Sequence, residues 1–170
     1  MIHYIYTPIL RWKQGEQKAL KNVTAHDRPL MLPIADVQAL ESGTTQSKLQ
    51  AQLIDAAGTE HPVGIDVATA YKSIVPLQAL ANLIGRLRTA GVNAWPVVHA
   101  IHALANLPTL AALEGQGNVV IRAFPEHMTL ADLITVLSAL RKVLGKSGRI
   151  HVLLDLYALG DIDPTAKAAL

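Results

Sequence analysis

The stretch Val63-Gly64-Ile65-Asp66 decides the fold class, because three later stretches repeat its pattern of apolar residues followed by one ionisable residue. The later stretches are Pro96–His99, Val119–Arg122 and Val152–Asp155. Runs as apolar as these are typical of parallel strands, which helices cover on both faces. A charge inside such a strand is costly unless it is paired or lies at a solvated end. We therefore expect the four ionisable residues to meet at the carboxyl edge of one parallel sheet, where α/β proteins build their sites.

Strand-like and helix-like segments alternate along the whole chain. Leucines in segment 76–90 recur with the spacing of one buried helix face. Thr129 followed by Asp132 resembles a capping box for a helix over 129–145. The alternation predicts strands near 3–10, 30–37, 62–68, 94–101, 118–124 and 150–157, and helices near 15–23, 45–57, 76–90, 105–114 and 129–145.

This alternation predicts an α/β fold of TIM-barrel-like (β/α) units with parallel strands. A complete barrel takes about 250 residues, whereas this chain has 170, so we expect an incomplete barrel of six units. Segment 163–170 reads as the start of a helix. We interpret residues 1–170 as a single α/β domain. In one interpretation, this domain is the N-terminal part of a longer (β/α)8 barrel. An open doubly wound sheet is the alternative, although no Gly-x-Gly-x-x-Gly motif supports dinucleotide binding.

Composition excludes several classes of function. The net charge is only +2 and no basic run occurs, so there is no strong signal for nucleic acid. Cysteine is absent, which excludes disulfides and thiolate chemistry. No apolar stretch reaches about 18 residues, and the N-terminus lacks the features of a signal peptide. We expect a cytoplasmic protein without a membrane segment.

The expected rim set consists of Asp66, His99, Arg122 and Asp155, with Asp36 as a further candidate. Two carboxylates, an imidazole and a guanidinium can perform acid–base chemistry or bind an anionic ligand. In the alternative, Arg122 pairs with Asp155 and Asp66 as a buried network that closes the barrel interior. The network is the favoured interpretation, and the four residues remain the catalytic candidates.

Two histidines, His99 and His102, are the only weak candidates for a metal site. Their spacing is poor evidence, because the pair spans a strand end where the side chains can diverge. We predict no cofactor and no metal, and a divalent ion is the less favoured alternative. No nucleophile elbow of the Gly-x-Ser-x-Gly type occurs.

The segment after the first strand is the second candidate region. It contains Trp12, Lys13 and Glu16, which would face the rim from the first βα loop. Glu16 would also lie in the first helical turn, where the helix dipole favours a carboxylate. These three residues are candidates for ligand binding. The alternative is that Trp12 plugs the barrel mouth and Glu16 caps the helix.

The segment Tyr6–Leu20 resembles the N-terminal segment of proteins in the phage Beta protein family. Members of this family are called beta family proteins and are of the satellite-phage and defence-island type. Leu32–Ile34, Pro62–Asp66, Asn118–Arg122 and His151–Asp155 are also similar, but only the first segment is specific. The resemblance corresponds to the N-terminal half of the family's usually longer members. It implies a barrel-like protein associated with phage or mobile-element antiviral defence. It implies no catalytic residues.

Two functions follow as expectations. In the first, the protein binds a protein partner, as an antitoxin, an inhibitor or a partner of a toxin or immune effector. In the second, it is a hydrolase or phosphodiesterase-type enzyme with its site at the strand C-termini, so whether it is an enzyme stays open. Self-association through open strand edges is a further mode of binding.

Overall fold

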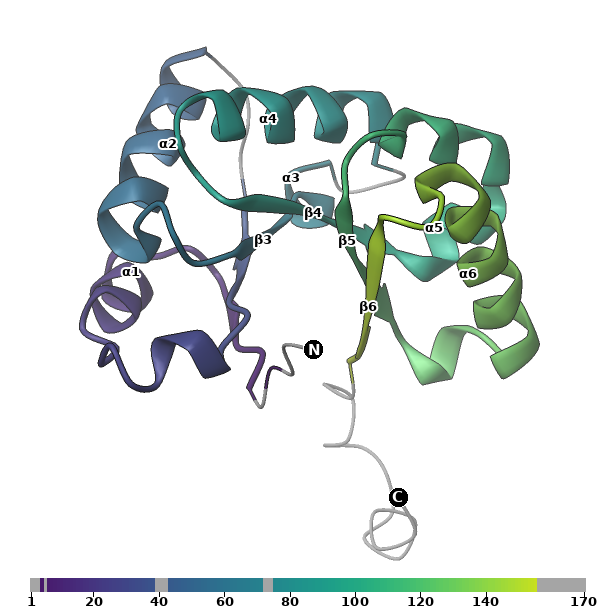
Figure 1. Ribbon diagram of the computed structural model, residues 1–170, viewed down its shortest axis with the longest axis horizontal. Helices are drawn as coiled ribbons and strands as arrows, with labels where there is room; N and C mark the ends of the chain where they lie inside the picture. Colours follow the sequence, from purple (N-terminus) through teal and green to yellow (C-terminus); the bar gives the residue numbers. More distant parts are fainter. Residues whose placement is uncertain (1–3, 5, 39–42, 72–74, 156–170) are drawn as a thin grey trace, which may run out of the picture.

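Six parallel strands form one sheet in the order β1-β2-β3-β4-β5-β6 (Figure 1). The computed structural model describes residues 4, 6–38, 43–71 and 75–155. Every strand pairs with the next one along the chain, and the sheet curls into a half-barrel. The strands are β1 Ile9–Leu10, β2 Ile34–Asp36, β3 Val63–Asp66, β4 Ala94–His99, β5 Asn118–Ala123 and β6 Arg149–Leu154. The predicted α/β fold with an incomplete barrel is confirmed.

Strand β4 pairs with its two neighbours through different halves of its length. Residues 94–96 pair with β3, whereas residues 97–99 pair with β5. Pro96 lies at the change of partner and has no N–H to donate, so the strand can turn away from β3 there without losing a hydrogen bond from that residue.

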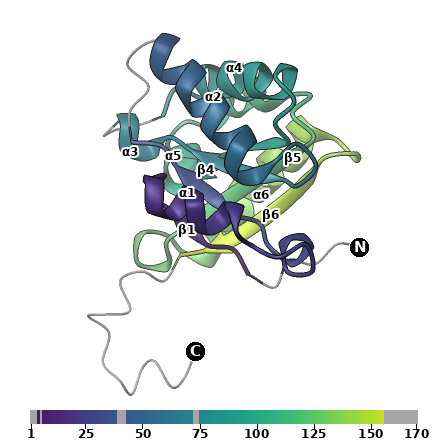
Figure 2. The same ribbon diagram turned by 90° about the vertical axis from the view of Figure 1, so that its left-hand side faces the viewer.

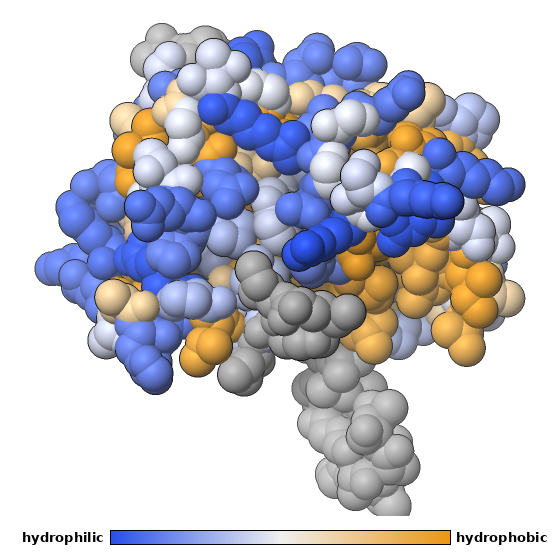
Figure 3. Space-filling model, viewed as in Figure 1, coloured by the Kyte–Doolittle hydropathy of each residue, from blue (hydrophilic) through white to orange (hydrophobic). Residues whose placement is uncertain are grey.

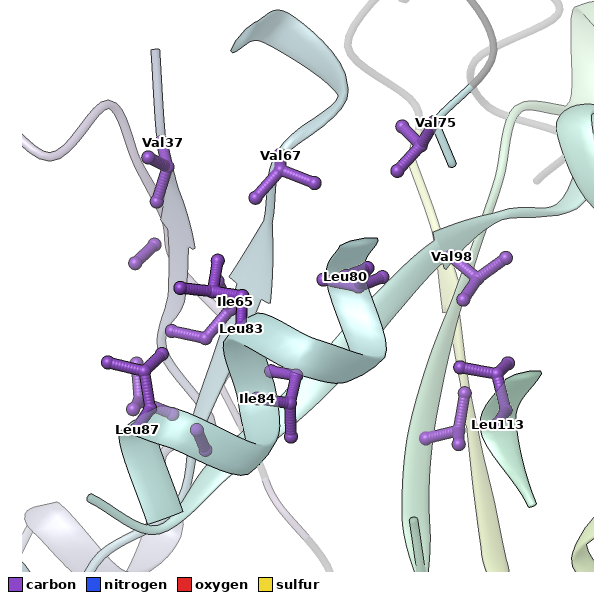
Figure 4. Close-up of a cluster of buried hydrophobic side chains, with 14 of the residues drawn as sticks. Val37, Ile65, Val67, Val75, Leu80, Leu83, Ile84, Leu87, Val98 and Leu113 are labelled. Atoms are coloured by element: carbon purple, nitrogen blue, oxygen red, sulfur yellow. The ribbon is translucent and has the colours of Figure 1, made fainter. Parts of the chain in front are cut away.

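Helices cover the outer face of the sheet (Figures 1 and 2). Leu80, Leu83, Ile84 and Leu87 of α4 are buried, and Figure 4 shows them facing Ile65 of β3. The helix spacing predicted from the sequence is therefore confirmed. The helical segments are α1 Gln14–Lys21, η1 Arg28–Leu30, α2 Gly43–Ala57, α3 Ala68–Tyr71, α4 Leu77–Thr89, α5 Ala100–Ala105, η2 Leu107–Leu113, η3 Pro125–His127 and α6 Leu130–Leu144.

A smaller apolar cluster lies on the inner, concave face of the sheet. It consists of Ile34, Trp95, Val97 and Val120 with Leu32 before β2. Gly64 has to be glycine here, because a Cβ atom on it would lie 2.3 Å from Cδ1 of Ile34. This apolar layer fills the half-barrel below its carboxyl edge and leaves that edge for the polar residues.

Two predicted segments differ from the structure. The helix predicted over 105–114 was wrong: α5 ends at Ala105, and Leu107–Leu113 forms a 3-10 helix instead. Pro108 lies at the start of that segment, where a continuous α-helix would lose a hydrogen bond. The strand predicted from residue 3 is reduced to Ile9–Leu10 and an isolated bridge between Tyr6 and Met31.

Three further expectations concern the segment 163–170, the cap of α6 and membrane-spanning helices. The helix start expected at 163–170 lies outside the described residues. The capping box of Thr129 and Asp132 is confirmed, with both reciprocal hydrogen bonds present. Within the described ranges, no helix has both the length and the apolar character needed to cross a bilayer.

Candidate functional site at the carboxyl edge

The structure brings all four predicted rim residues together. Oδ2 of Asp66 accepts hydrogen bonds from Nη1 of Arg122 at 2.7 Å and from the His99 imidazole, whose Nε2 lies 2.9 Å away. Asp66 is on β3, His99 on β4 and Arg122 on β5, so one carboxylate oxygen connects three strands. The repeated pattern of the sequence therefore marks one convergent cluster, which we call the rim network: Asp66, His99, Arg122 and Asp155.

Asp155 holds the other side of the Arg122 guanidinium. Nε of Arg122 donates to Oδ2 of Asp155 at 2.7 Å, and Nη2 donates to the same oxygen. The backbone N–H of Asp155 donates to the carbonyl of Ala123, which extends the β5–β6 ladder to this residue. Both carboxylates are almost inaccessible, with exposures of 1% for Asp66 and 6% for Asp155. Arg122 is consequently clamped between two buried anions.

Phe124 covers the network from the end of β5. Its ring centroid lies 5.1 Å from Cζ of Arg122 and 5.2 Å from the His99 ring. A guanidinium over an aromatic ring gains a cation–π contact and is shielded from water. Phe124 was not among the predicted site residues, although its position at the end of a predicted strand was an available signal.

The electrostatics of Asp66 favour its ionised form. Burial on its own would raise the pKa of this carboxyl, because a charge is poorly solvated in the interior. Hydrogen bonds from His99, from the backbone N–H of Ala68 at 3.0 Å and from Arg122 outweigh that effect and lower the pKa. Burial likewise opposes the charge on Arg122, but the two carboxylates raise its pKa overall. The cluster is therefore a charged network.

Asp36 and His102 flank the network. Asp36 lies opposite Asp66 in the β2–β3 register, and its Oδ1 is buried without a hydrogen bond among the described residues. His102 stacks on His99 with the ring centroids 5.5 Å apart and the planes 15° from parallel. Burial lowers the pKa of His102, and the nearby His99 lowers it further.

The stacked histidines are poorly arranged to share a metal ion. The lone pair of an imidazole nitrogen lies in the ring plane, so two nearly parallel stacked rings direct their lone pairs side by side. Across the residues that the structure describes, no group of three His, Cys, Asp or Glu residues could hold a metal ion.

Trp12, Lys13 and Glu16 form a separate region. The backbone N–H of Lys13 donates to Oε2 of Glu16 at 3.2 Å, and Nε2 of Gln17 donates to the carbonyl of Trp12 at 2.9 Å. The hydrogen bonds of this loop thus stay within the β1–α1 segment. Glu16 acts as the expected cap of α1, whereas Trp12 and Lys13 line a small pocket beside α2.

A comparison with known families identifies the chain's relatives. The family model described as Beta protein matches residues 6–170. The chain belongs to the Beta protein family. The match includes the complete rim network and the β1–α1 loop, so both candidate regions lie in the part of the chain that defines membership of the Beta protein family. No curated protein and no solved structure matches the chain.

Proposed function

We propose that this Beta protein family member acts by binding another protein, as an antitoxin, an inhibitor or a partner of a toxin or immune effector in phage or mobile-element defence. The observation that carries the proposal is the free edge and apolar outer face of β6. The link to defence rests on the family to which the chain belongs.

The two edges of the sheet differ in how they are protected. At one edge β1 has two residues, whereas at the other edge β6 has six. Natural sheets usually protect an edge by keeping it short, charged or covered. Among the described residues, β6 has a strand neighbour on one side only. A long and apolar edge strand of this kind is typical of a surface that accepts another strand.

Exposed apolar side chains adjoin this edge. Val152 and Leu154 on β6 are 45% and 56% exposed, and Leu130 and Ile134 on α6 are 73% and 54% exposed. Figure 3 shows the corresponding hydrophobic area over β6 and α6. We call these four residues the β6–α6 patch. Contiguous exposed apolar residues are typical of interaction sites on soluble proteins.

The chemistry of the edge defines the kind of partner. A partner would contribute an extended segment that pairs with the backbone of β6 and places alternate apolar side chains against Val152 and Leu154. Strand addition of this kind obtains affinity from main-chain hydrogen bonds and specificity from alternate side chains. We commit to such a segment of another protein as the occupant of the edge.

The rim network supports binding over catalysis. Its single guanidinium already contacts two carboxylates, so it offers no free cation to a phosphate or carboxylate substrate. The carboxylates are likewise engaged and buried. Such a saturated cluster is well suited to holding β3, β4, β5 and the end of β6 in a curled arrangement.

One observation favours the second function, a hydrolase or phosphodiesterase-type enzyme. His99 keeps 12% exposure, and its ring is oriented by a buried carboxylate at 2.9 Å. A histidine oriented in this way is the usual general base of hydrolytic sites. In that function, Asp66 would orient His99, and a substrate would approach the exposed side of the imidazole.

A paired set of variants distinguishes the two functions. The chain is co-expressed with a toxin or immune effector that impairs growth, and growth rescue and complex formation by gel filtration are measured. Binding through β6 predicts that Val152→Lys with Leu154→Lys abolishes both readouts, whereas His99→Gln leaves both intact. Lys142→Gln on the exposed side of α6 is the matched surface control.

The opposite pattern would support the enzyme. Loss of rescue in His99→Gln, with an intact fold by circular dichroism and retention of rescue in the β6 variant, contradicts the binding proposal. The chain alone could also form a dimer that Val152→Lys dissociates. That result would show that β6 pairs with a second copy of the chain, and it would contradict the proposal that β6 binds a different protein.

A further inference from the structure

A pocket of about 260 Å³ lies between the β1–α1 loop, the end of β2 and α2, apart from the rim network. The loop contributes Arg11, Trp12 and Lys13 to its lining, and Gln38 follows β2. Lys48 and Gln52 on α2 face them from the other side. The pocket therefore combines side chains that are distant in sequence.

The charge of this pocket has one sign. Arg11, Lys13 and Lys48 are the ionisable residues of its lining, and all three are cations. Within the described ranges, none of the three has an ion-pair partner. Like charges placed around one small hollow repel each other, and an anion that binds between them relieves that repulsion. The amides of Gln38 and Gln52 add neutral hydrogen-bond donors.

The backbone of Trp12 is the second, independent observation. Its φ of 54° lies in the left-handed region, and it is the one non-glycine residue with positive φ in the described part of the chain. A bulky side chain in this conformation is strained and persists only where its surroundings hold it. The hydrogen bond from Gln17 to the carbonyl of Trp12 holds the loop in this form. Strain of this kind concentrates at ligand clamps.

The indole N–H of Trp12 is a donor for which the described protein supplies no acceptor. Nε1 is buried and has no hydrogen-bond partner. A buried donor without a partner is uncommon in folded proteins and calls for a specific reason. The same burial closes this nitrogen to the pocket, so the wall that Trp12 forms is the surface of its ring.

We propose that this pocket binds the phosphate group of a small phosphorylated ligand. Arg11 offers a planar pair of donors to phosphate oxygens, and Lys13 and Lys48 supply point charges from opposite sides. The Trp12 ring forms one wall of the pocket. The volume lies below the range of about 300–1,000 Å³ that is usual for larger ligands, so it fits a phosphate or a small phosphate monoester. The site is independent of strand addition at β6.

Trp12 itself provides the measurement. Trp95→Phe leaves Trp12 as the only tryptophan, and its fluorescence is followed while inorganic phosphate is added at a constant ionic strength of about 0.15 M. We expect a saturable change in emission. Lys13→Gln and Lys48→Gln should each weaken binding about tenfold, the effect of losing one charge-assisted hydrogen bond. Lys142→Gln on α6 should leave the affinity unchanged.

Isothermal titration calorimetry of the wild-type chain with inorganic phosphate provides a check that does not depend on fluorescence. Lys13→Gln and Lys48→Gln should each weaken phosphate binding in this assay as well. The proposal is overturned if phosphate produces no saturable signal in either method. It is equally overturned if Lys142→Gln weakens binding as much as Lys48→Gln, because the effect would then be one of general charge.

Discussion

Nη1 of Arg122 on β5 lies 2.7 Å from Oδ2 of Asp66 on β3, so this ion pair spans the strand between them. That strand, β4, contributes His99 to the same oxygen at 2.9 Å. A contact across an intervening strand is feasible on the concave face of a curled sheet, where side chains from non-adjacent strands converge. The contacts of the rim network thus depend both on the curl of the sheet and on the four side chains that form them.

Removing the guanidinium should strongly destabilise the fold. Arg122→Met leaves Asp66 and Asp155 buried without their shared cation, and breaking a buried ion pair typically costs about 3–5 kcal/mol. Urea denaturation should show a loss of this size. Lys21→Met is the control, because Lys21 forms an ion pair with Asp55 in which both side chains are largely exposed. Such exposed pairs contribute about 1 kcal/mol or less to stability.

A double-mutant cycle tests whether the network acts as a unit. Arg122→Met combined with Asp66→Leu should cost less than the sum of the single changes, because the second change removes a carboxylate that the first left unpaired. Additive effects, to within about 0.5 kcal/mol, would show that the two side chains are not coupled.

The stability of the fold should decrease as the pH falls below the ordinary histidine range. Burial, together with the charge of Arg149, lowers the pKa of His151 below its usual value of 6.5, so the folded chain holds this ring neutral while the unfolded chain protonates it. The contribution of His151 is therefore present above about pH 6.5 and lost as the pH falls towards its lowered pKa. Tyr4 and Trp95 stack around the ring and keep it from water.

His151→Phe provides the measurement of this effect. The variant keeps an aromatic ring in the cluster but cannot be protonated. Its free energy of unfolding in urea should fall less than that of the wild type between about pH 7.5 and about pH 5. An identical pH dependence in the two proteins would contradict the assignment of this titration to His151.

Two glycines should respond to alanine in opposite directions. A Cβ atom on Gly148 would lie 2.6 Å from Cβ of Leu144 and 2.8 Å from the carbonyl oxygen of Gly117, so Gly148→Ala should destabilise by about 1–3 kcal/mol. A Cβ atom on Gly85, an exposed residue of α4, meets nothing within 4 Å. Gly85→Ala should therefore stabilise by about 0.5–1 kcal/mol through helix propensity. Thermal unfolding measures both, and equal signs would contradict the packing around Gly148.

Much of the fold could be predicted because parallel strands and their helices leave strong patterns. Asp66, His99, Arg122 and Asp155 were expected at one edge because the carboxyl ends of parallel strands share an edge. The segment 105–114 misled the prediction, since its alanines and leucines suit an α-helix as well as a 3-10 helix, and only Pro108 indicated otherwise. The left-handed backbone of Trp12 could not be predicted, because tertiary contacts rather than residue type impose it.

The favoured interpretation of the rim residues, a buried network in which Arg122 pairs with Asp155 and Asp66, agrees with the ion pairs of the structure. The part of His99 was beyond the sequence, because its contact with Asp66 depends on the curvature of the sheet, which no local pattern reports. Arg11 and Lys48 were not recognised as members of one pocket, because nothing in the sequence indicates that α2 lies beside the β1–α1 loop. The position of β6 at one end of the described sheet, in contrast, agrees with the expected order of (β/α) units.

Hydrogen exchange of the β6 backbone, measured by NMR, directly tests whether a partner protein adds a strand to β6. The N–H groups of Arg149 and Asp155 donate to the carbonyls of Gly117, just before β5, and of Ala123 in β5. Strand alternation therefore directs the N–H groups of Ile150, Val152 and Leu154 to the opposite side of β6. In the free chain these three amides should exchange faster than those of His151 and Leu153. When the partner protein binds, the three should become protected. A complex that forms while all three amides keep their free exchange rates would contradict strand addition at β6.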